Sequence, residues 1–320
     1  MTPNAPLFLS EADVGDLVDV ADAIDALDGC FGASPDETYI VPRQRAPLPG
    51  GMFHLMAATY AAGDVFGLKA YSGAPQGTFY HVMLYSYSER RLLALIEANL
   101  LSQLRTGAAS GLATRQMARA DADVLAVIGT GKQAFWQAAA IAAVRDLKEI
   151  RVFGRDRERR EAFAGSVESR LAISTRSAPD AETCVRGASI VATITKAHSP
   201  VCLSAWVDDG AHVNVAGANA ADRREVDGAL IERAALLVTD DIPQAHMEAA
   251  EFRDLAATGA FDWARVRTLS DVTRSPPARR AADVTLFKSL GVAIEDVALA
   301  KLVYARAVAE GRGVPIDRNP

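Results

Sequence analysis

The sequence predicts an α/β protein with a Rossmann-type, doubly wound parallel sheet. Three observations support this prediction. From Val124 onward, short apolar runs alternate with helix-like segments, as they do in βαβ units. The run 124–128, VLAVI, has no polar residue, as expected for a strand buried on both faces of a parallel sheet. A glycine-containing turn follows that run directly. The residues before Val124 have a different pattern, which predicts a second, α+β region with an antiparallel sheet.

Composition limits the class of protein. The chain has 320 residues and half of them are hydrophobic, so it can bury a substantial core. Its formal net charge is -6 and no long cluster of Lys and Arg is present, which argues against nucleic acid as a partner. Cys30, Cys184 and Cys202 lack the spacing of a metal site and predict reduced thiols. We find no targeting segment and no long apolar run, and therefore expect a cytoplasmic protein without membrane contact.

The N-terminal region is predicted to start with a single helix over residues 10–31, for which Ser10 is the N-cap. Short runs rich in β-branched and aromatic residues follow, and they predict a curved antiparallel sheet. The predicted strands are 52–60, 65–73, 78–86 and 91–99. The next segment, 100–118, is rich in leucine and small residues and has the length of a helix that leads out of the sheet.

The alternating region begins with the strand at 124–128 and a helix after it. Further strands are predicted at 149–153, 189–194, 211–217, 235–240 and 283–287. A helix is predicted at 158–171, after the second strand. The last amphipathic segment, 292–311, ends at a glycine and is typical of a helix of about five turns.

The turn after the first buried strand fits the pattern G-x-G-x-x-G/A, with Gly129, Gly131 and Ala134 in the small-residue positions. The first glycine permits a tight turn, the second lets the backbone approach a pyrophosphate, and the alanine lets the helix pack on its strand. The helix N-terminus then presents free N–H groups to the phosphates. The other residues of the turn expected to contact the dinucleotide are Thr130, Lys132 and Gln133. The alternative is a glycine turn of structural use only.

The residues after strand 149–153 bear on the choice of dinucleotide. An NAD site usually has a carboxylate near this point, which binds the ribose hydroxyl. Arg155 could instead pair with a 2′-phosphate through its planar guanidinium, so NADP(H) is the preferred coenzyme and NAD(H) remains possible. Asp156 is a second candidate contact. The alternatives are a solvated charge at Arg155 and a helix N-cap at Asp156.

Four segments resemble the ornithine cyclodeaminase/mu-crystallin family in order and spacing. They are LRTGAASGLATRQMAR, VIGTGKQA, DDGAHVNVAGANAADRREVD and TLFKSLGVAIEDVALAKLVY, and PRQRAPLPGGMFHLMAATYAAGDVFGLKAYSG fits as well. The similarity extends over nearly the whole chain. It implies a homodimer in which residues 1–118 and 292–320 form a substrate-binding and dimerisation domain, with its sheet joined by the C-terminal helix. Residues 119–291 would form the dinucleotide-binding Rossmann domain.

The resemblance places a carboxylate clamp and an active-site lysine at Arg43, Lys69 and Arg105. Arg45 is a rival for Arg43, because alternation along a strand would put both on one face. A lysine in an apolar strand is costly unless it is paired, so burial would lower the pKa of Lys69 and make it a proton donor or acceptor. The alternatives are a lysine that snorkels to the sheet edge, and a surface Arg105 paired with Glu97 or another acid.

Two positions depart from the cyclodeaminases of this family, which carry glutamate where His54 stands and aspartate where Asn219 stands. Asn219 cannot act as a general base, and this argues against ornithine cyclisation. His54 could transfer protons near neutral pH, or it could be a structural histidine. The resemblance also places a further group of residues at the coenzyme, namely Thr193, Thr195, Gly217, Ser289 and Leu290.

These residues predict an NADP-dependent imine reductase or amino-acid dehydrogenase. Hydride would reach the C=N carbon of a 2-imino or cyclic ketimine carboxylate held by Arg43 and Arg105, with Lys69 handling the proton and Asn219 orienting the substrate or the nicotinamide. The reverse reaction is the oxidation of an amino acid. The family resemblance leaves two alternatives, a cyclodeaminase that uses NAD catalytically and a non-catalytic NADPH-binding protein like the crystallin.

Overall fold

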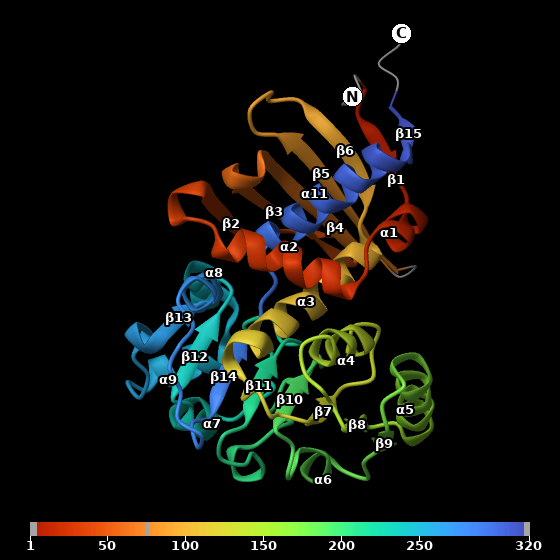
Figure 1. The fold of residues 1–320 in the computed structure, drawn as a ribbon. Coiled ribbons are helices and arrows are strands. Elements are labelled where there is room, and N and C mark those ends of the chain that lie inside the picture. The colour runs from red at the N-terminus through yellow and green to blue at the C-terminus, as the bar shows by residue number, and fades with distance from the viewer. Residues whose placement is uncertain (1–4, 75–76, 317–320) are drawn as a thin grey trace. The chain divides into compact units, whose positions relative to one another are not determined.

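The computed structural model describes residues 5–74 and 77–316, and its chain forms two compact units. The first unit combines Met1–Arg105 with Val292–Pro320, and the second unit is Thr106–Gly291. The chain passes from the first unit to the second within helix α3 (Asn99–Met117), whereas the sequence predicts the border at residue 118, just after this helix. Figure 1 shows the elements of both units.

The sheet of the first unit has seven strands among the described residues, in the order β15-β1-β6-β5-β4-β3-β2 (Figure 1). Strands β2 to β6 pair with their sequence neighbours in antiparallel fashion, as predicted, but β1 pairs with β6 in parallel. The prediction of a wholly antiparallel sheet is therefore wrong at this edge. The strands are β1 (Leu7–Leu9), β2 (Thr38–Leu48), β3 (Gly51–Tyr60), β4 (Val65–Ala74), β5 (Gly77–Ser86), β6 (Leu92–Glu97) and β15 (Val314–Pro315).

The N-terminal helical segment is broken in two, whereas a single helix over 10–31 was expected. Ser10 caps α1 (Glu11–Leu17) in a capping box with Asp13, which confirms the predicted N-cap. Asp19 then caps α2 (Val20–Gly32) in a second capping box with Asp22. Two capped starts so close together interrupt the helix, because each N-cap residue takes up an extended backbone.

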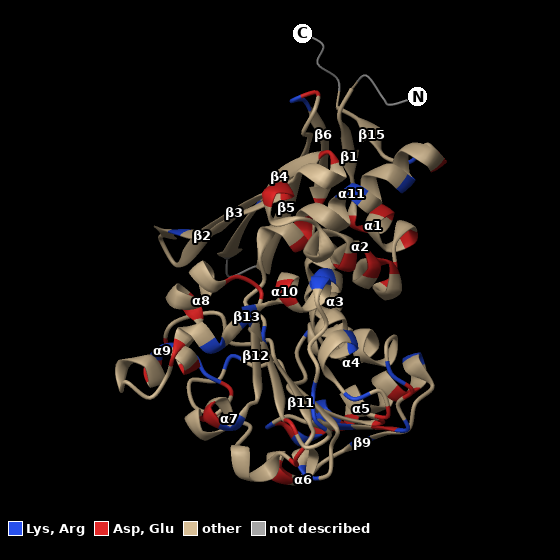
Figure 2. Ribbon diagram, turned by 60° about the vertical axis from the view of Figure 1, so that its left-hand side comes forward, with Lys and Arg blue, Asp and Glu red and all other residues tan. Residues whose placement is uncertain are grey.

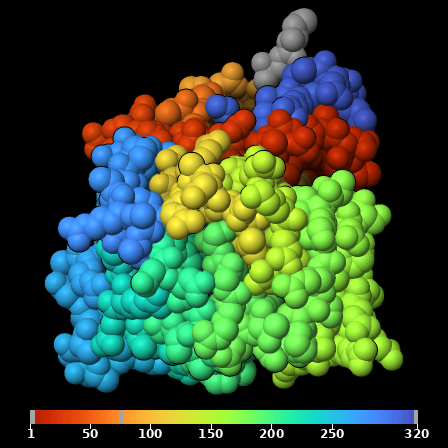
Figure 3. Space-filling model, turned by 60° about the horizontal axis from the view of Figure 1, so that its bottom comes forward, coloured from red at the N-terminus to blue at the C-terminus, as the bar shows by residue number. Residues whose placement is uncertain are grey.

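Helix α11 (Ala293–Glu310) brings the C-terminal part of the chain into the first unit. It ends at Gly311 in a left-handed conformation, as the sequence predicts. It packs against α2 and the inner face of the sheet, and in Figure 3 its deep blue atoms lie beside the red N-terminal helices. Arg306 of α11 forms an ion pair with Asp22 at 2.6 Å, among the acidic residues that appear red on α1 and α2 in Figure 2.

The second unit has a parallel sheet of eight strands within the described residues, in the order β13-β12-β14-β11-β10-β7-β8-β9. This confirms the predicted α/β fold class. The strands are β7 (Val124–Ile128), β8 (Glu149–Phe153), β9 (Thr175–Ser177), β10 (Ile190–Thr193), β11 (His212–Val215), β12 (Leu236–Thr239), β13 (Val266–Thr268) and β14 (Thr285–Lys288). The helices besides α3 are α4 (Ala134–Ala142), α5 (Arg157–Leu171), α6 (Ala181–Val185), α7 (Gly228–Arg233), α8 (Ile242–Glu248), α9 (Ala250–Ala257) and α10 (Leu269–Arg274).

Both faces of this sheet are buried. Along β7, Leu125 and Val127 belong to one apolar cluster, and Ala126 and Ile128 belong to the other. Alternate residues of a strand point to opposite faces, so the two clusters cover the two sides of the sheet. Short 3-10 helices complete the two units: η1 (Pro35–Glu37), η2 (Ala61–Gly63), η3 (Ser204–Trp206) and η4 (Trp263–Arg265). None of the helices in the described residues has the length and apolar character to cross a bilayer.

Candidate active site

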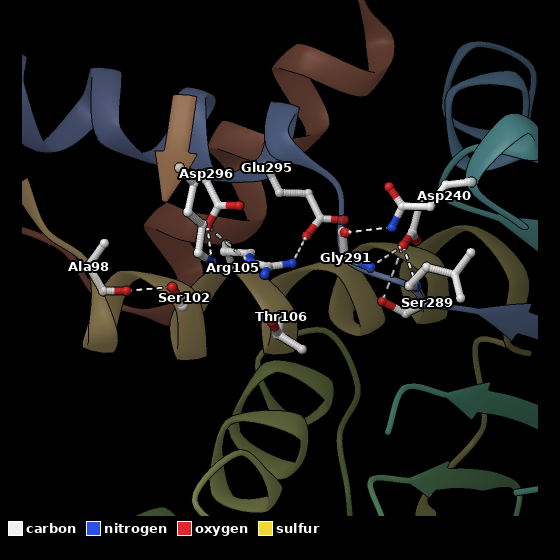
Figure 4. A network of polar contacts seen from close by, with 12 residues as sticks. Ala98, Ser102, Arg105, Thr106, Asp240, Ser289, Gly291, Glu295 and Asp296 are labelled. Atoms are coloured by element: carbon white, nitrogen blue, oxygen red, sulfur yellow. Dashed lines mark hydrogen bonds and ion pairs between the residues drawn. The ribbon is translucent and has the colours of Figure 1, made fainter. Parts of the chain in front are cut away.

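A buried cluster of two cations and two acids lies in the first unit. Lys69 on β4 and Arg105 on α3 are 1% and 6% exposed. The acids are Glu295 and Asp296, in the first turn of α11. Lys69 Nζ donates to Asp296 Oδ1 at 2.8 Å, and Arg105 Nη1 donates to Glu295 Oε2 at 2.6 Å. Arg105 Nε also lies 3.2 Å from Asp296 Oδ1, and Figure 4 shows the guanidinium pointing at both acids.

These contacts decide between the alternatives for the two cations. Lys69 does not snorkel to a sheet edge, and Arg105 pairs with Glu295 instead of Glu97. Burial, followed by the charge of Arg105, lowers the pKa of Lys69 to about 7, although Asp296 acts in the opposite direction. Burial would lower the pKa of Arg105 too, but Asp296 and Glu295 outweigh it and raise that pKa. At neutral pH, Lys69 is therefore poised to release a proton, whereas Arg105 stays charged.

Aromatic rings from neighbouring strands line this cluster. His54, Tyr71 and Tyr80 are cross-strand partners on β3, β4 and β5. The ring of His54 stacks on Tyr71 with centroids 4.4 Å apart, and Tyr71 stacks on Tyr80 at 4.9 Å. Lys69 Nζ lies 5.7 Å from the centroid of Tyr71 and 5.1 Å from that of Tyr80. A cation over π faces gains some of the electrostatic stabilisation that it loses on leaving water.

The pKa of His54 lies below the range in which a histidine transfers protons near neutral pH. Burial, then the charges of Arg45 and Arg43, lower the pKa of its ring to about 4. The imidazole is therefore neutral at pH 7, which favours the structural histidine of the two alternatives that the sequence leaves open. Arg43 is 4% exposed and lies within the irregularity that shifts the register of β2 between Val41 and Gln44, whereas Arg45 is exposed and follows it. Arg45 is the cross-strand partner of His54, so these two side chains lie on the same face of the sheet.

The glycine turn of the second unit has the geometry of a dinucleotide-binding turn. Gly129 has a φ of 123°, and a Cβ there would lie 2.4 Å from the carbonyl oxygen of Ile194. A Cβ on Gly131 would meet no atom within 4 Å, so this glycine leaves open space beside the backbone. Ala134 is fully buried and starts α4, where its N–H donates to the carbonyl of Gly131 at 3.0 Å. Packing within the chain explains Gly129 and Ala134, whereas Gly131 fits the approach of a ligand.

Polar groups of the turn region fit a bound dinucleotide. No side chain caps the N-terminus of α4, because Gln133 at the N-cap position makes no cap hydrogen bond. The side-chain oxygens of Gln133 and Thr193 are buried and have no hydrogen-bond partner among the described residues. Buried polar atoms normally find a partner, so these atoms are suited to a ligand. A Cβ on Gly154 would lie 2.9 Å from Thr130, which brings the end of β8 against the turn. Lys132 is exposed.

The two residues that bear on coenzyme choice have different surroundings. Asp156 is the N-cap of α5, and its carboxylate accepts the N–H of Arg159 at 2.9 Å. This structural duty is one of the alternatives considered from the sequence. Arg155 is exposed, directly after Gly154, and its side chain has no partner among the described residues. Its guanidinium is therefore available to a ligand bound at the turn.

Two acids that the sequence analysis missed hold the remaining coenzyme candidates. Thr195 and Gly217 both bind Glu225, which is fully buried. Asp240 binds the residues that follow β14: its Oδ2 accepts from the backbone N–H of Leu290 at 2.5 Å and lies 3.5 Å from Ser289 Oγ (Figure 4). Asp240 ends the otherwise apolar stretch ALLVTD, and that is the signal that could have identified it, whereas Glu225 stands among charged residues in DRREVD and has no such signal. Asn219 lies half-buried in the loop after β11.

The coenzyme candidates share one edge of the sheet. They lie at or after the ends of β7, β8, β10, β11 and β14, which are five consecutive neighbours in the order β14-β11-β10-β7-β8. Because the strands are parallel, their carboxyl ends meet at one edge, which is where open α/β sheets bind ligands. The structure thus brings together Lys69, Arg105 and His54 in the first unit, and the turn and loop residues in the second.

Comparisons with known proteins agree with this geometry. Residues 4–311 match the model of the ornithine cyclodeaminase/mu-crystallin family. The ketimine reductase mu-crystallin of Mus musculus is 32% identical over 314 residues, which cover 94% of this chain and 97% of the mouse protein. A Delta(1)-pyrroline-2-carboxylate reductase of Bacillus cereus is 34% identical over 239 residues, or 74% of this chain and 73% of that protein.

Solved structures show the same fold. The Delta(1)-pyrroline-2-carboxylate reductase of Thermococcus litoralis, in complex with NADH and L-proline, matches with a TM-score of 0.91 and 26% identity over 97% of this chain and 100% of that chain. An archaeal alanine dehydrogenase dimer with bound NAD matches with a TM-score of 0.91 and 27% identity over 98% and 99%.

Proposed function

Because the chain belongs to the ornithine cyclodeaminase/mu-crystallin family, we propose that it is an NAD(P)H-dependent oxidoreductase of small imino or amino acids. It would reduce the C=N bond of a ketimine carboxylate, or oxidise the corresponding amino acid. Two relatives are named for such reductions, which supports the proposal. The observation that carries it is Lys69, a buried amine with a pKa of about 7, held by Asp296 beside the cation Arg105. An imine reductase needs a proton donor of this kind next to a carboxylate-binding group.

The residues divide the work of the reaction. A bound nicotinamide coenzyme would supply hydride for the C=N carbon. Nη1 of Arg105 donates to Glu295 and Nε lies beside Asp296, so Nη2 is the group that we assign to the substrate carboxylate, with Arg43 as the second carboxylate ligand. Lys69 supplies the proton that the substrate nitrogen takes up. Asn219 orients the substrate or the nicotinamide, since an amide cannot act as a base.

The second unit would hold the coenzyme by its backbone and small residues. Gly131 leaves room for a pyrophosphate, and the uncapped start of α4 supplies N–H groups and the positive end of a helix dipole. Gln133 and Thr193 have buried oxygens available for it. The exposed, unpartnered Arg155 favours NADP(H), because a guanidinium pairs with the 2′-phosphate that NAD(H) lacks.

The exposed face of the first unit's sheet supports the further proposal of a homodimer. Large hydrophobic side chains are exposed there at alternate positions of β2 and β3, including Tyr39, Val41, Phe53 and Leu55, and Phe79 on β5 is 59% exposed. Contiguous exposed apolar side chains mark interaction surfaces. A structure of the family at 27% identity is described as a dimer.

The test of the activity follows NADPH absorbance with purified protein. The substrates are Δ1-pyrroline-2-carboxylate, Δ1-piperideine-2-carboxylate, and pyruvate with ammonia or methylamine. We expect consumption with at least one of them, and a loss of kcat of about 100-fold or more in Lys69→Met, which removes the proton donor. Binding of NADPH to wild type without turnover of any substrate would exclude the reductase. Ammonia release from ornithine without net NADPH change would instead identify a cyclodeaminase.

A further inference from the structure

The side chain of Glu225 joins two loops of the second unit. It is fully buried and accepts four hydrogen bonds. Its Oε1 accepts from the backbone N–H and the hydroxyl of Thr195, at 2.6 Å and 2.8 Å. Its Oε2 accepts from the N–H groups of Gly217 and Ala218, at 2.7 Å and 3.0 Å. Thr195 follows β10 and the other two residues follow β11, so one carboxylate ties together the ends of two neighbouring strands.

The end of a third strand, β14, is connected to the loops that Glu225 joins. Lys288, the last residue of β14, donates to the carbonyl of Ala218 at 2.7 Å and to Glu251 at 3.1 Å. Glu251 in turn accepts the backbone N–H of Glu225 at 3.0 Å. The loops are so close that a Cβ on Gly217 would lie 2.1 Å from the nitrogen of Thr195. The loop ends of β10, β11 and β14 therefore form a single polar assembly, inside which Gly217 has a packing role.

The ionised form of Glu225 is what makes this assembly possible. Burial raises the pKa of its carboxyl, while Lys288 and the bonds from Thr195 and Gly217 act against that shift. A proton on Oε2 would point a donor at the N–H groups of Gly217 and Ala218, and one of these bonds would be lost. The other titratable groups that face Glu225 are Glu251, bound to Lys288, and the buried thiol of Cys202.

We infer that Glu225 is a positioning residue for the coenzyme, and that its carboxylate holds the loops after β10 and β11 in the shape that receives the nicotinamide half. The inference rests on the proposed function. The loops that Glu225 joins carry Thr195, Gly217 and Asn219, and Lys288 directly precedes Ser289. Glu225 itself acts only through these loops. Preorganised groups bind a ligand more tightly because the ordering cost is already met in the free protein.

The test measures the dissociation constant of NADH by fluorescence titration from about pH 5.5 to about pH 8. NADH is used because the 2′-phosphate of NADPH itself titrates near pH 6. In wild type, we expect affinity to weaken toward acid pH as Glu225 takes up a proton. In Glu225→Gln, the amide NH2 group faces backbone N–H donors at every pH, either those of Gly217 and Ala218 or that of Thr195. We expect binding weaker by about tenfold or more at neutral pH, and independent of pH over this range.

Asp227→Asn is the matched control. Asp227 is two residues away and also accepts backbone N–H groups, those of Ser204 and Leu230, but it caps α7 and touches neither loop. We expect Asp227→Asn to lower the melting temperature and to leave both the NADH affinity and its pH dependence as in wild type. This separates a positioning role from a general loss of stability.

The outcomes distinguish the two levels of proposal. If wild type fails to bind NADH and NADPH, the proposed function fails. If wild type binds NADH but Glu225→Gln binds it equally well, or keeps the wild-type pH dependence, the inference about Glu225 alone is overturned. Should Glu225→Gln not fold, Thr195→Val removes one bond to Glu225 and keeps the charge. It is expected to weaken NADH by about two- to tenfold, and unchanged affinity would contradict the inference.

Discussion

Lys69 shows how a fold can adapt an amine to chemistry at neutral pH. An exposed lysine stays protonated well above neutral pH, but burial and the neighbouring charge of Arg105 bring the pKa of Lys69 to about 7. Asp296 prevents a larger fall by binding the ammonium form. The pair thus sets the pH at which the amine gives up its proton. Asp296 lies in the first turn of α11, far along the chain from Lys69 on β4.

Replacing Asp296 should therefore move the pH profile of the reaction. In Asp296→Asn the charge that stabilises protonated Lys69 is gone, so the pKa of Lys69 falls further. Reduction needs the protonated amine, and kcat/KM for imine reduction should begin to decline at a lower pH than in wild type, by about one pH unit. The pH dependence of kcat/KM with saturating NADPH measures this. A profile that stays in place, or moves to higher pH, would contradict the role of Asp296.

Arg155 gives a second prediction, about coenzyme choice. Arg155→Ala removes the cation available to a 2′-phosphate, which amounts to about 1.5–3 kcal/mol of a charge-assisted hydrogen bond. NADPH should bind about tenfold or more weakly, whereas NADH, which lacks this phosphate, should keep its affinity. Titration of both coenzymes checks the result. Arg157→Ala is the control, because Arg157 is exposed and already pairs with Glu161. Equal losses for the two coenzymes would remove the argument from Arg155.

The sequence predicts residue roles where the residue type itself is unusual for its place. A lysine in an apolar strand and a glycine pair after a buried strand are such cases. Lys69 is buried and Gly129 has a positive φ, as those patterns predict, and their roles stay predictions. Glu225 could not be found this way, because acids are common in charged loop segments and only the fold shows what it binds. The lowered pKa of His54 results from burial and then from Arg45 and Arg43 on another strand, and neither is visible in the sequence around His54.

Helix α3 illustrates how packing overrides helix propensity. A Cβ on Gly107 would lie 2.3 Å from the carbonyl oxygen of Trp136 in α4, so the two helices can approach each other only at a glycine. Gly165 in α5 has no atom within 4 Å of the corresponding position. Both glycines lie inside helices, where alanine is intrinsically more favourable by about 1 kcal/mol.

The two glycines therefore form a matched pair of variants. Gly165→Ala should raise the free energy of unfolding by up to about 1 kcal/mol. Gly107→Ala should lower it by about 1–3 kcal/mol, because the added methyl group forces the backbones of α3 and α4 apart. Urea unfolding of each variant measures the changes. Stabilisation by Gly107→Ala would show that the helices tolerate separation and that Gly107 is not required by packing.

The elements that the sequence predicts least well lie at the edges of the first unit. β2 contains Pro42 and Pro47, which argue against a strand, but it is the edge strand of its sheet and the missing N–H groups cost little there. The break between α1 and α2 was missed because apolar residues keep helical spacing across Asp19. The long strands β3 to β5 and the six inner strands of the parallel sheet were predicted, since alternation and buried apolar runs are strong local signals. The short edge strands β9 and β13 were not predicted.

The exposed face of the first unit's sheet carries large apolar side chains, which are unfavourable in contact with water and which a dimer interface would bury. Phe53→Asp combined with Leu55→Asp should prevent assembly by placing two charges on the exposed face of β3. Light scattering after gel filtration should give twice the chain mass for wild type and a single chain mass for the double variant. Met247→Asp, at an exposed position of α8 in the second unit, should remain a dimer. A monomeric wild type would contradict the proposed assembly.

The first unit is discontinuous, and this affects the order in which the chain can fold during synthesis. Strand β1 pairs on one side with β15, which is translated about 300 residues later. The sheet also lacks α11 until the entire parallel-sheet unit has emerged. The second unit, by contrast, is continuous and can form as soon as its own residues are translated. A chain that stops before α11 would thus contain a complete second unit. Its N-terminal sheet would keep an exposed apolar face, to which chaperones could bind.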